Sequence, residues 1–323
     1  MSGLKKLLST DLKGVFGGLL KERELTAQDL EVLARFQQRI IHDSSVSPLS
    51  GTGAPPAATQ TPGGTPIKSE FERLYVDPRV AFGAGPDSGN PNIRELAGKR
   101  PIWDFLKNPR FAEGMALVVL GAPGSGRSAM LQHLALILAL GAQSRFDCRP
   151  FVPIPISVTG QLVPWERERQ PNLAAGLQAF YQKDKELALP SHWFSHILER
   201  GDTLLLVDGL DEVAEAQRRA VMTFLEKQLS TYPRARIIAT ARPQGYREVP
   251  FKNAWLLELQ PFGAEQVRRN GFQPDQASIV VERALNMPSP RKSCRQILVK
   301  TGVEQDIAIE RNLSLFAQQL QPE

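Results

Sequence analysis

A glycine-rich segment has the residue types and spacing of a phosphate-binding loop. Residues 121–128 read GAPGSGRS, between the apolar run Ala116–Leu120 and a stretch with helical periodicity. This is the spacing G-x-x-x-x-G-K-[ST], with Arg127 in the place of the lysine. Glycines let successive backbone N–H groups turn toward an anion, and the start of the following helix adds positive partial charge. The segment therefore predicts a nucleotide phosphate site, in which Ser128 binds magnesium and Arg127 reaches the outer phosphates.

The arginine at position 127 leaves two functions open. Arginine keeps the positive charge and binds phosphate in a forked geometry, but it is larger and planar where lysine is a compact point charge. Phosphate binding tolerates this change, whereas hydrolysis depends on close positioning of the reacting groups. The loop is therefore compatible with a nucleotide-hydrolysing protein and with a non-hydrolysing nucleotide-binding scaffold.

A second candidate segment is an apolar run that ends in acidic residues. Residues 203–208 read TLLLVD and are followed by GLDE. A carboxylate at the end of a buried strand, here Asp208, is the magnesium partner that a phosphate loop requires. Ligands bind open α/β sheets at the carboxyl edge of the strands, so we expect Asp208 and the loop to meet in one crevice. Asp211 and Glu212 are both candidates for orienting or deprotonating an attacking water.

The elements that position these residues alternate between strands and helices. The expected strands are near-continuous apolar runs, which is typical of a parallel sheet covered by helices on both faces. They are Ala116–Leu120, Val152–Val158, Thr203–Asp208, Arg236–Ala241 and Trp255–Leu259. Helical spacing of apolar residues occurs between them, over Ser128–Leu140 and Glu215–Leu229. The pattern predicts an α/β P-loop NTPase fold with an open, parallel, five-stranded sheet.

A small helical segment is expected at the N-terminus, over residues 1–43. Thr26 and Asp29 have the spacing of a capping box that begins the second of two helices. One apolar face follows at helical spacing, formed by Leu30, Leu33, Phe36 and Ile40. A helix pair of this size buries little surface alone, so we expect this face to pack on a partner or on another copy of the chain.

Composition divides the rest of the chain. Residues 44–67 are rich in Ser, Pro, Gly and Thr and predict a disordered linker. The nucleotide-binding domain is expected over residues 68–269. Residues 270–323 form a short C-terminal tail whose fold the sequence does not indicate.

Three segments together, GAPGSGRS, LLLVDGLDE and IIATARP, resemble the NACHT family of STAND-class P-loop NTPases. The likeness spans residues 72–268. It matches Asp208, the small Gly209 and the following acidic pair to the family's acidic motif. It also matches Thr240 and Arg242 to a strand end at which the arginine senses the terminal phosphate.

The resemblance implies a molecular switch in signalling or defence. Such proteins exchange ADP for ATP (or GTP) with Mg²⁺, hydrolyse the nucleotide slowly, form homo-oligomers and activate an N-terminal effector, here through residues 1–43. The implied catalytic residues are Asp211, Glu212 and Arg242. The implied nucleotide-binding residues are Gly121, Ala122, Pro123, Gly124, Ser125, Gly126, Arg127, Ser128, Ala129, Asp208 and Thr240, with Ser128 and Asp208 as magnesium ligands.

Two departures limit the resemblance. Arg127 replaces the loop lysine, as described above. The family usually continues into a helical bundle, a winged helix and a repeat-built sensor, for which residues 270–323 are too short.

Composition excludes several other classes of protein. With 42% hydrophobic and 23% charged residues in 323, the chain has globular character. No apolar run approaches the roughly 18–20 residues of a membrane span, and no secretory signal is expected, so we expect a cytoplasmic protein. Only two cysteines occur, which predicts no disulfide framework. A net charge of +5 is compatible with phosphate binding, and a nucleic acid is not expected as the main partner.

Overall fold

The computed structural model describes residues 25–45, 75–83, 95–111, 115–123, 125–167, 172–262 and 266. The expectations for residues 1–24, for the linker from residue 46 onward, for Gly124 and for the C-terminal tail lie outside the described residues.

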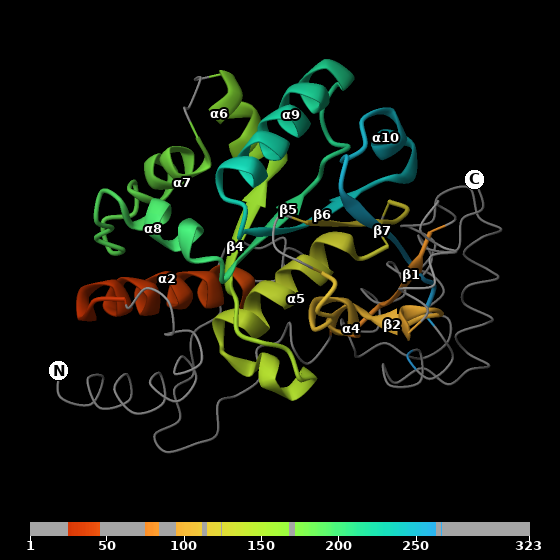
Figure 1. Ribbon diagram of the computed structural model, residues 1–323, viewed down its shortest axis with the longest axis horizontal. Helices are drawn as coiled ribbons and strands as arrows, with labels where there is room; N and C mark the ends of the chain where they lie inside the picture. The colour runs from red at the N-terminus through yellow and green to blue at the C-terminus, as the bar shows by residue number, and fades with distance from the viewer. Residues whose placement is uncertain are drawn as a thin grey trace, which may run out of the picture.

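A seven-stranded sheet forms the centre of the domain (Figure 1). Its spatial order is β2-β1-β7-β3-β6-β5-β4. The strands are β1 Arg79–Phe82, β2 Arg100–Pro101, β3 Ala116–Leu120, β4 Val152–Ser157, β5 Thr203–Asp208, β6 Arg236–Ala241 and β7 Ala254–Leu259. The five strands from β3 to β7 are parallel, which confirms the predicted fold class.

Two further strands extend the sheet beyond the five that were predicted. β1 pairs antiparallel with β7 and with β2. β1 has four residues and β2 has two, so neither is long enough to produce a recognisable hydrophobic period. They cover the edge of β7, which would otherwise present unpaired backbone groups.

Helices lie on both faces of the sheet. In Figure 1, α5 lies on one side of the sheet with α2 beside it, and α9 and α10 lie on the other side. The described helices of five or more residues are α2 Ala27–Ser45, α4 Ile102–Leu106, α5 Arg127–Ala139, α6 Val163–Arg167, α7 Leu173–Tyr181, α8 Trp193–Arg200, α9 Glu215–Thr231 and α10 Pro243–Glu248, with short 3-10 and π segments at Ala142–Phe146 and Val158–Leu162. None of the helices within the described ranges is long and apolar enough to cross a lipid bilayer.

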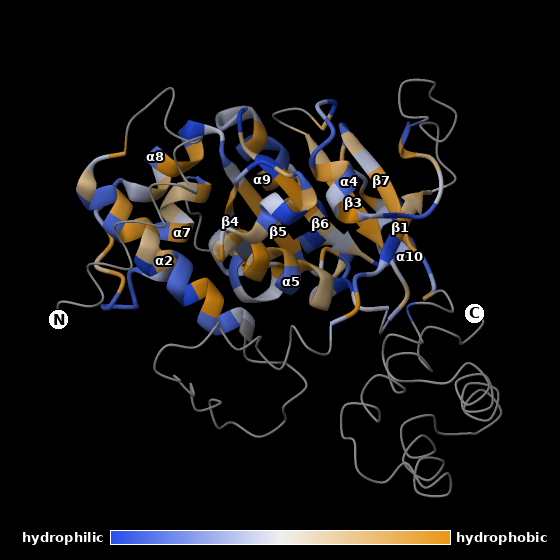
Figure 2. Cartoon of the chain, turned by 90° about the horizontal axis from the view of Figure 1, so that it is seen from below, coloured by the Kyte–Doolittle hydropathy of each residue, from blue (hydrophilic) through white to orange (hydrophobic). Residues whose placement is uncertain are grey.

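The core follows the parallel strands. Every residue of β3 and β6 is buried, as are the first five residues of β5. Figure 2 shows hydrophobic residues concentrated along these strands and on the helix surfaces that face them. Such rigid, fully buried strands fix the position of whatever follows their carboxyl ends.

The capping box at the start of α2 is confirmed. The Thr26 hydroxyl accepts a hydrogen bond from the Asp29 backbone N–H at 3.1 Å, and an Asp29 carboxylate oxygen accepts from the Thr26 backbone N–H at 3.0 Å. Two backbone donors at the helix start are satisfied in this way. The helix then continues through Ser45, so residues 44 and 45, which the sequence assigned to the linker, are helical.

The apolar face of α2 packs on its own chain, where we had expected a partner or a second copy. Phe36 is fully buried and makes edge-to-face contacts with Tyr181 of α7 and with Trp193 and Phe194 of α8, at ring-centroid distances of 5.1–5.6 Å. Helical periodicity showed that the face is buried, but it could not show against what. These aromatic residues lie about 150 residues away in sequence, where no local pattern connects them to α2.

Polar contacts add to this attachment. The Gln132 side-chain amide of α5 donates to the Ser44 carbonyl at 2.8 Å. Arg39 of α2 forms an ion pair with Asp184, beyond the end of α7. α2 therefore contacts α5, the helix that follows the glycine-rich loop.

Candidate nucleotide-binding site

The three motifs meet at the carboxyl edge of the sheet. β3, β6 and β5 are neighbours in that order, and all are parallel. The loop after β3, the segment 209–214 between β5 and α9 (the acidic segment) and Arg242 after β6 therefore leave the sheet on the same side. β6 lies between the other two, although it comes last in the sequence, and so Thr240 and Arg242 lie between the loop and the acidic segment.

The glycine-rich loop is a compact turn from β3 into α5. The Gly121 N–H donates to the Ala241 carbonyl at 3.2 Å, and the Ser125 N–H donates to the Ala122 carbonyl at 3.1 Å. Gly126 precedes α5 with φ +91°, a left-handed backbone conformation that residues other than glycine rarely adopt. The helix begins at Arg127, so Ser128 and Ala129 lie in its first turn, where backbone N–H groups have no partner within the helix.

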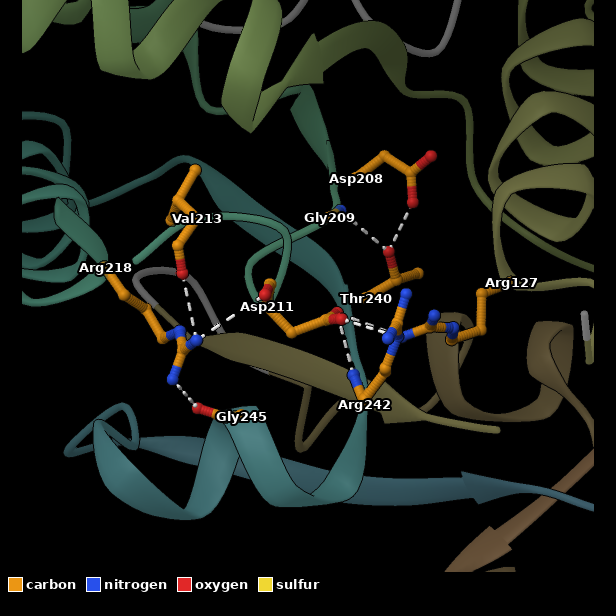
Figure 3. Close-up of polar contacts among 9 residues, drawn as sticks. All are labelled: Arg127, Asp208, Gly209, Asp211, Val213, Arg218, Thr240, Arg242 and Gly245. Carbon is orange, nitrogen blue, oxygen red and sulfur yellow. Dashed lines mark hydrogen bonds and ion pairs between the residues drawn. The ribbon is translucent and has the colours of Figure 1, made fainter. Parts of the chain in front are cut away.

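A buried carboxylate, Asp211, joins the two arginines of the site (Figure 3). Arg127 Nη1 lies 3.1 Å from Asp211 Oδ1, and Arg242 Nε lies 3.0 Å from Oδ2. The Arg242 backbone N–H also donates to Oδ1 at 2.8 Å. The Asp211 side chain is 3% exposed and that of Arg127 is 12% exposed, whereas that of Arg242 is 53% exposed. Each guanidinium has five N–H donors, so a single contact with Asp211 orients it and leaves further donors for phosphate.

Asp208 is held by Thr240. The Thr240 hydroxyl donates to Asp208 Oδ1 and accepts from the Gly209 N–H at 3.2 Å. Thr240 is 1% exposed. Gly209 has φ +85°, which lets the chain turn sharply after β5. Asp208 therefore sits at a defined position at the end of its strand, with one carboxylate oxygen engaged by Thr240.

Glu212 differs from Asp211 in exposure and in charge environment. Its side chain is exposed, and its pKa lies above the ordinary value. Partial burial is the main cause, and the negative charges of Asp208 and Asp211 add to it, while Arg127 and Arg242 act in the opposite direction. A carboxylate with a raised pKa is a better proton acceptor than an ordinary one. The edge of the sheet thus combines an engaged acid, Asp211, with an exposed one.

Comparison with known protein families decides the assignment. The family model of the NACHT domain matches residues 115–284, a range that begins just before β3 and contains all three motifs. The chain belongs to the NACHT family. The resemblance seen in the sequence is confirmed, and the chain is a nucleotide-binding P-loop NTPase domain by family.

Solved structures and curated proteins add little to this assignment. One similar structure is described as "Structure of C. elegans PCH-2", with 12% identity, 63% of this chain covered and a TM-score of 0.27; this chain spans 60% of its length. Another is described as "Structural Basis for Katanin Self-Assembly", with 14% identity, coverage of 68% and 76%, and a TM-score of 0.28. TM-scores this low do not support any conclusion about the function of this chain. The search of curated proteins found no match.

The donor set of this NACHT domain fits a magnesium ion that is shared with a nucleotide. Within the described residues there is no group of three or more His, Cys, Asp or Glu side chains that could hold a metal. Magnesium, however, is usually bound by one or two protein oxygens together with phosphates and water. The exposed Ser128 hydroxyl and the Asp208 carboxylate are oxygen ligands of this type.

One residue of the site, Arg218 on α9, was missed by reasoning from sequence. It is 8% exposed and donates to backbone carbonyls of the acidic segment and of α10. The sequence does indicate that Arg218 is buried, because it has helical spacing to Val221, Met222 and Leu225, which lie on the apolar face of α9. A basic residue on the apolar face of a helix indicates a buried polar contact. The sequence could not show which groups it contacts, because these are backbone carbonyls of other segments.

Proposed function

We propose that this NACHT protein is a STAND-type molecular switch that binds ATP (or GTP) and ADP and hydrolyses the triphosphate slowly with Mg²⁺. One observation carries the proposal: Arg127 and Arg242, from distant segments, both contact Asp211, and Asp208 ends the neighbouring strand at the same edge of the sheet. A terminal phosphate spreads its negative charge over three non-bridging oxygens, and two arginines together with a magnesium ion held by Asp208 would neutralise that charge.

Each residue of the site receives a role from its contacts. The backbone of Gly121 to Gly126 and the first turn of α5, through Ala129, bind the phosphates. Ser128 and Asp208 hold magnesium, which neutralises phosphate charge when bound. Thr240 acts through Asp208, because its buried hydroxyl is bonded to that carboxylate.

The two acidic candidates separate by their surroundings. Both oxygens of Asp211 are engaged by the arginines, so we assign it the positioning of Arg127 and Arg242. Glu212 is exposed and has a raised pKa, so we assign it the orientation of the attacking water.

The test is nucleotide binding and turnover by the purified chain. We expect Mg-ATP or Mg-GTP to raise the melting temperature and phosphate to be released slowly. Asp208→Asn is expected to abolish the magnesium dependence while weak nucleotide binding remains. Asp147→Asn, which removes the same charge at an exposed position before β4, is the matched control and is expected to behave as wild type. No thermal shift with any nucleotide would overturn the proposal.

A second candidate function, a non-hydrolysing scaffold, is favoured by the ion pair between Arg127 and Asp211. A guanidinium held on a buried carboxylate is poorly placed to follow the phosphate through a transition state. Arg127→Lys separates the two functions. If turnover rises by orders of magnitude from a value near zero, the natural protein is a binder and not an enzyme.

The remaining elements of the switch are also proposals. We propose a role in signalling or defence, a cytoplasmic location, a homo-oligomeric active state and an effector that acts through residues 1–43. The contact between α2 and α5 supports this coupling, because α5 begins at the phosphate loop. We propose the division into an N-terminal helical segment, a linker that begins after Ser45 and ends at residue 67, a NACHT domain over 68–269 and a separate segment over 270–323.

A further inference from the structure

Arg218 connects α10 with the acidic segment, which contains Asp211. Its Nη1 donates to the Gly245 carbonyl at 2.8 Å and its Nη2 donates to the Val213 carbonyl at 3.0 Å, with the Asp211 carbonyl at 3.5 Å from the same nitrogen (Figure 3). Gly245 lies in α10, and Val213 lies in the acidic segment after β5. The planar guanidinium therefore fixes the distance between these two segments with bonds in different directions.

α10 and the acidic segment also approach each other closely at Gly245. A Cβ atom added at Gly245 would lie 2.7 Å from the Asp211 Cβ, which is closer than real Cβ atoms approach. Glycine at this position lets α10 approach the acidic segment directly. α10 begins immediately after Arg242, so the placement of α10 also places the Arg242 backbone and side chain.

We propose that Arg218 is a positioning residue for recognition of the terminal phosphate. Resting on the proposed function above, it sets the specificity of that site for triphosphate over diphosphate. Arg218 acts through Asp211 and Arg242, by holding α10 against the acidic segment so that the exposed guanidinium of Arg242 faces the terminal phosphate. The hydrogen bonds of Arg218 described above go to α10 and to the acidic segment, whereas the inner phosphates are bound by a different segment, the loop between β3 and α5. Loss of Arg218 therefore weakens the binding of a triphosphate much more than the binding of a diphosphate.

The chain offers a matched control in Arg236 at the start of β6. Arg236 is 6% exposed, and it also bonds backbone carbonyls: its Nε donates to Phe111 at 3.1 Å and its Nη1 to Gly201 at 3.3 Å. It lies at the amino end of the strand whose carboxyl end carries Arg242. Arg236→Gln therefore removes a buried arginine of the same kind at the opposite edge of the sheet.

The experiment is calorimetric titration of the full chain with ADP and with the non-hydrolysable ATP analogue AMP-PNP, both with magnesium, or with the guanosine pair if the wild type binds that pair. For Arg218→Gln we expect the Kd of the triphosphate to rise about tenfold or more and that of the diphosphate to change less than about twofold. Arg236→Gln is expected to leave both Kd values within about twofold of wild type, even if its melting temperature falls as far as that of Arg218→Gln.

The outcomes are distinct. The inference is overturned if Arg218→Gln keeps its affinity for the triphosphate or loses affinity for both nucleotides equally. It is also overturned if Arg236→Gln shows the same selective loss of triphosphate affinity. If Arg218→Gln does not fold, Arg218→Lys is measured instead; a selective triphosphate loss of about threefold supports the inference, and none overturns it. A wild type that binds neither nucleotide overturns the proposed function itself.

Discussion

Replacing the Thr240 hydroxyl with a methyl group tests how firmly the end of β5 is held. Thr240→Val keeps the shape of the side chain but removes both of its hydrogen bonds, to Asp208 and to the Gly209 N–H. A hydrogen bond to a charged group contributes about 1.5–3 kcal/mol, and a buried N–H that is left without an acceptor costs about 1–3 kcal/mol. Because Thr240 is 1% exposed, water cannot easily replace the hydroxyl, and we expect the free energy of unfolding to fall by about 3 kcal/mol.

A double-mutant cycle separates the two bonds. Asp208→Ala is made in the wild type and in Thr240→Val, and the four proteins are unfolded in urea. The cost at Gly209 is the same in both backgrounds, so the interaction energy reports the bond between Thr240 and Asp208, which we expect to contribute about 1.5 kcal/mol. Effects that add to within about 0.3 kcal/mol would refute this reasoning, because they would mean that the two side chains act independently.

The same substitution has a functional readout. Thr240→Val leaves Asp208 free to rotate, so the magnesium concentration for half-maximal phosphate release is expected to rise several-fold. Thr240→Ser keeps the hydroxyl and loses only a methyl group, and it is expected to keep the magnesium requirement of the wild type. If Ser and Val shift it equally, the hydroxyl has no part in holding Asp208.

Two further predictions concern stability. Phe36→Ala removes a fully buried ring from the contact between α2 and α8 and is expected to cost about 3–5 kcal/mol in urea unfolding, while Phe180→Ala, whose ring is 38% exposed, costs about 1 kcal/mol; equal losses would contradict the observed burial. Burial lowers the pKa of His133 to about 4 and raises that of Asp77 to about 6. Below pH 6.5 the unfolded state binds a proton at His133 more readily than the folded state, so acidification from pH 7 to 4 lowers the free energy of unfolding through His133. At Asp77 the folded state binds the proton more readily, so the same acidification raises the free energy of unfolding. Relative to wild type over that range, His133→Phe should gain about 3 kcal/mol and Asp77→Asn should lose about 2 kcal/mol in free energy of unfolding. Parallel pH profiles for all three proteins would contradict this.

The parts of the fold that the sequence predicted are those with strong local signals. β3, β5 and β6 have the expected bounds, because a fully buried parallel strand is a continuous apolar run. β1 and β2 were missed because two to four residues have no period.

Long-range packing was beyond the sequence for a different reason. The phosphate-loop motif and the family resemblance together indicated that Arg127 and Arg242 share one edge of the sheet. It could not indicate that a single carboxylate, Asp211, contacts both, or that Arg218 holds the backbone of Asp211. These contacts depend on the strand order, with β6 between β3 and β5, and strand order is a property of the whole sheet.

This strand order also determines when the phosphate loop can form during synthesis. β3 carries the loop, yet its two neighbours in the sheet, β6 and β7, come from residues 236–259 near the end of the described domain. A nascent polypeptide on the ribosome therefore holds the apolar strand Ala116–Leu120 without either partner until more than a hundred further residues have been added. Such non-local pairing slows folding and exposes the intermediate to aggregation. The nucleotide site, which includes Thr240 and Arg242 at the end of β6, can therefore be complete only after this late strand has joined β3 to β5.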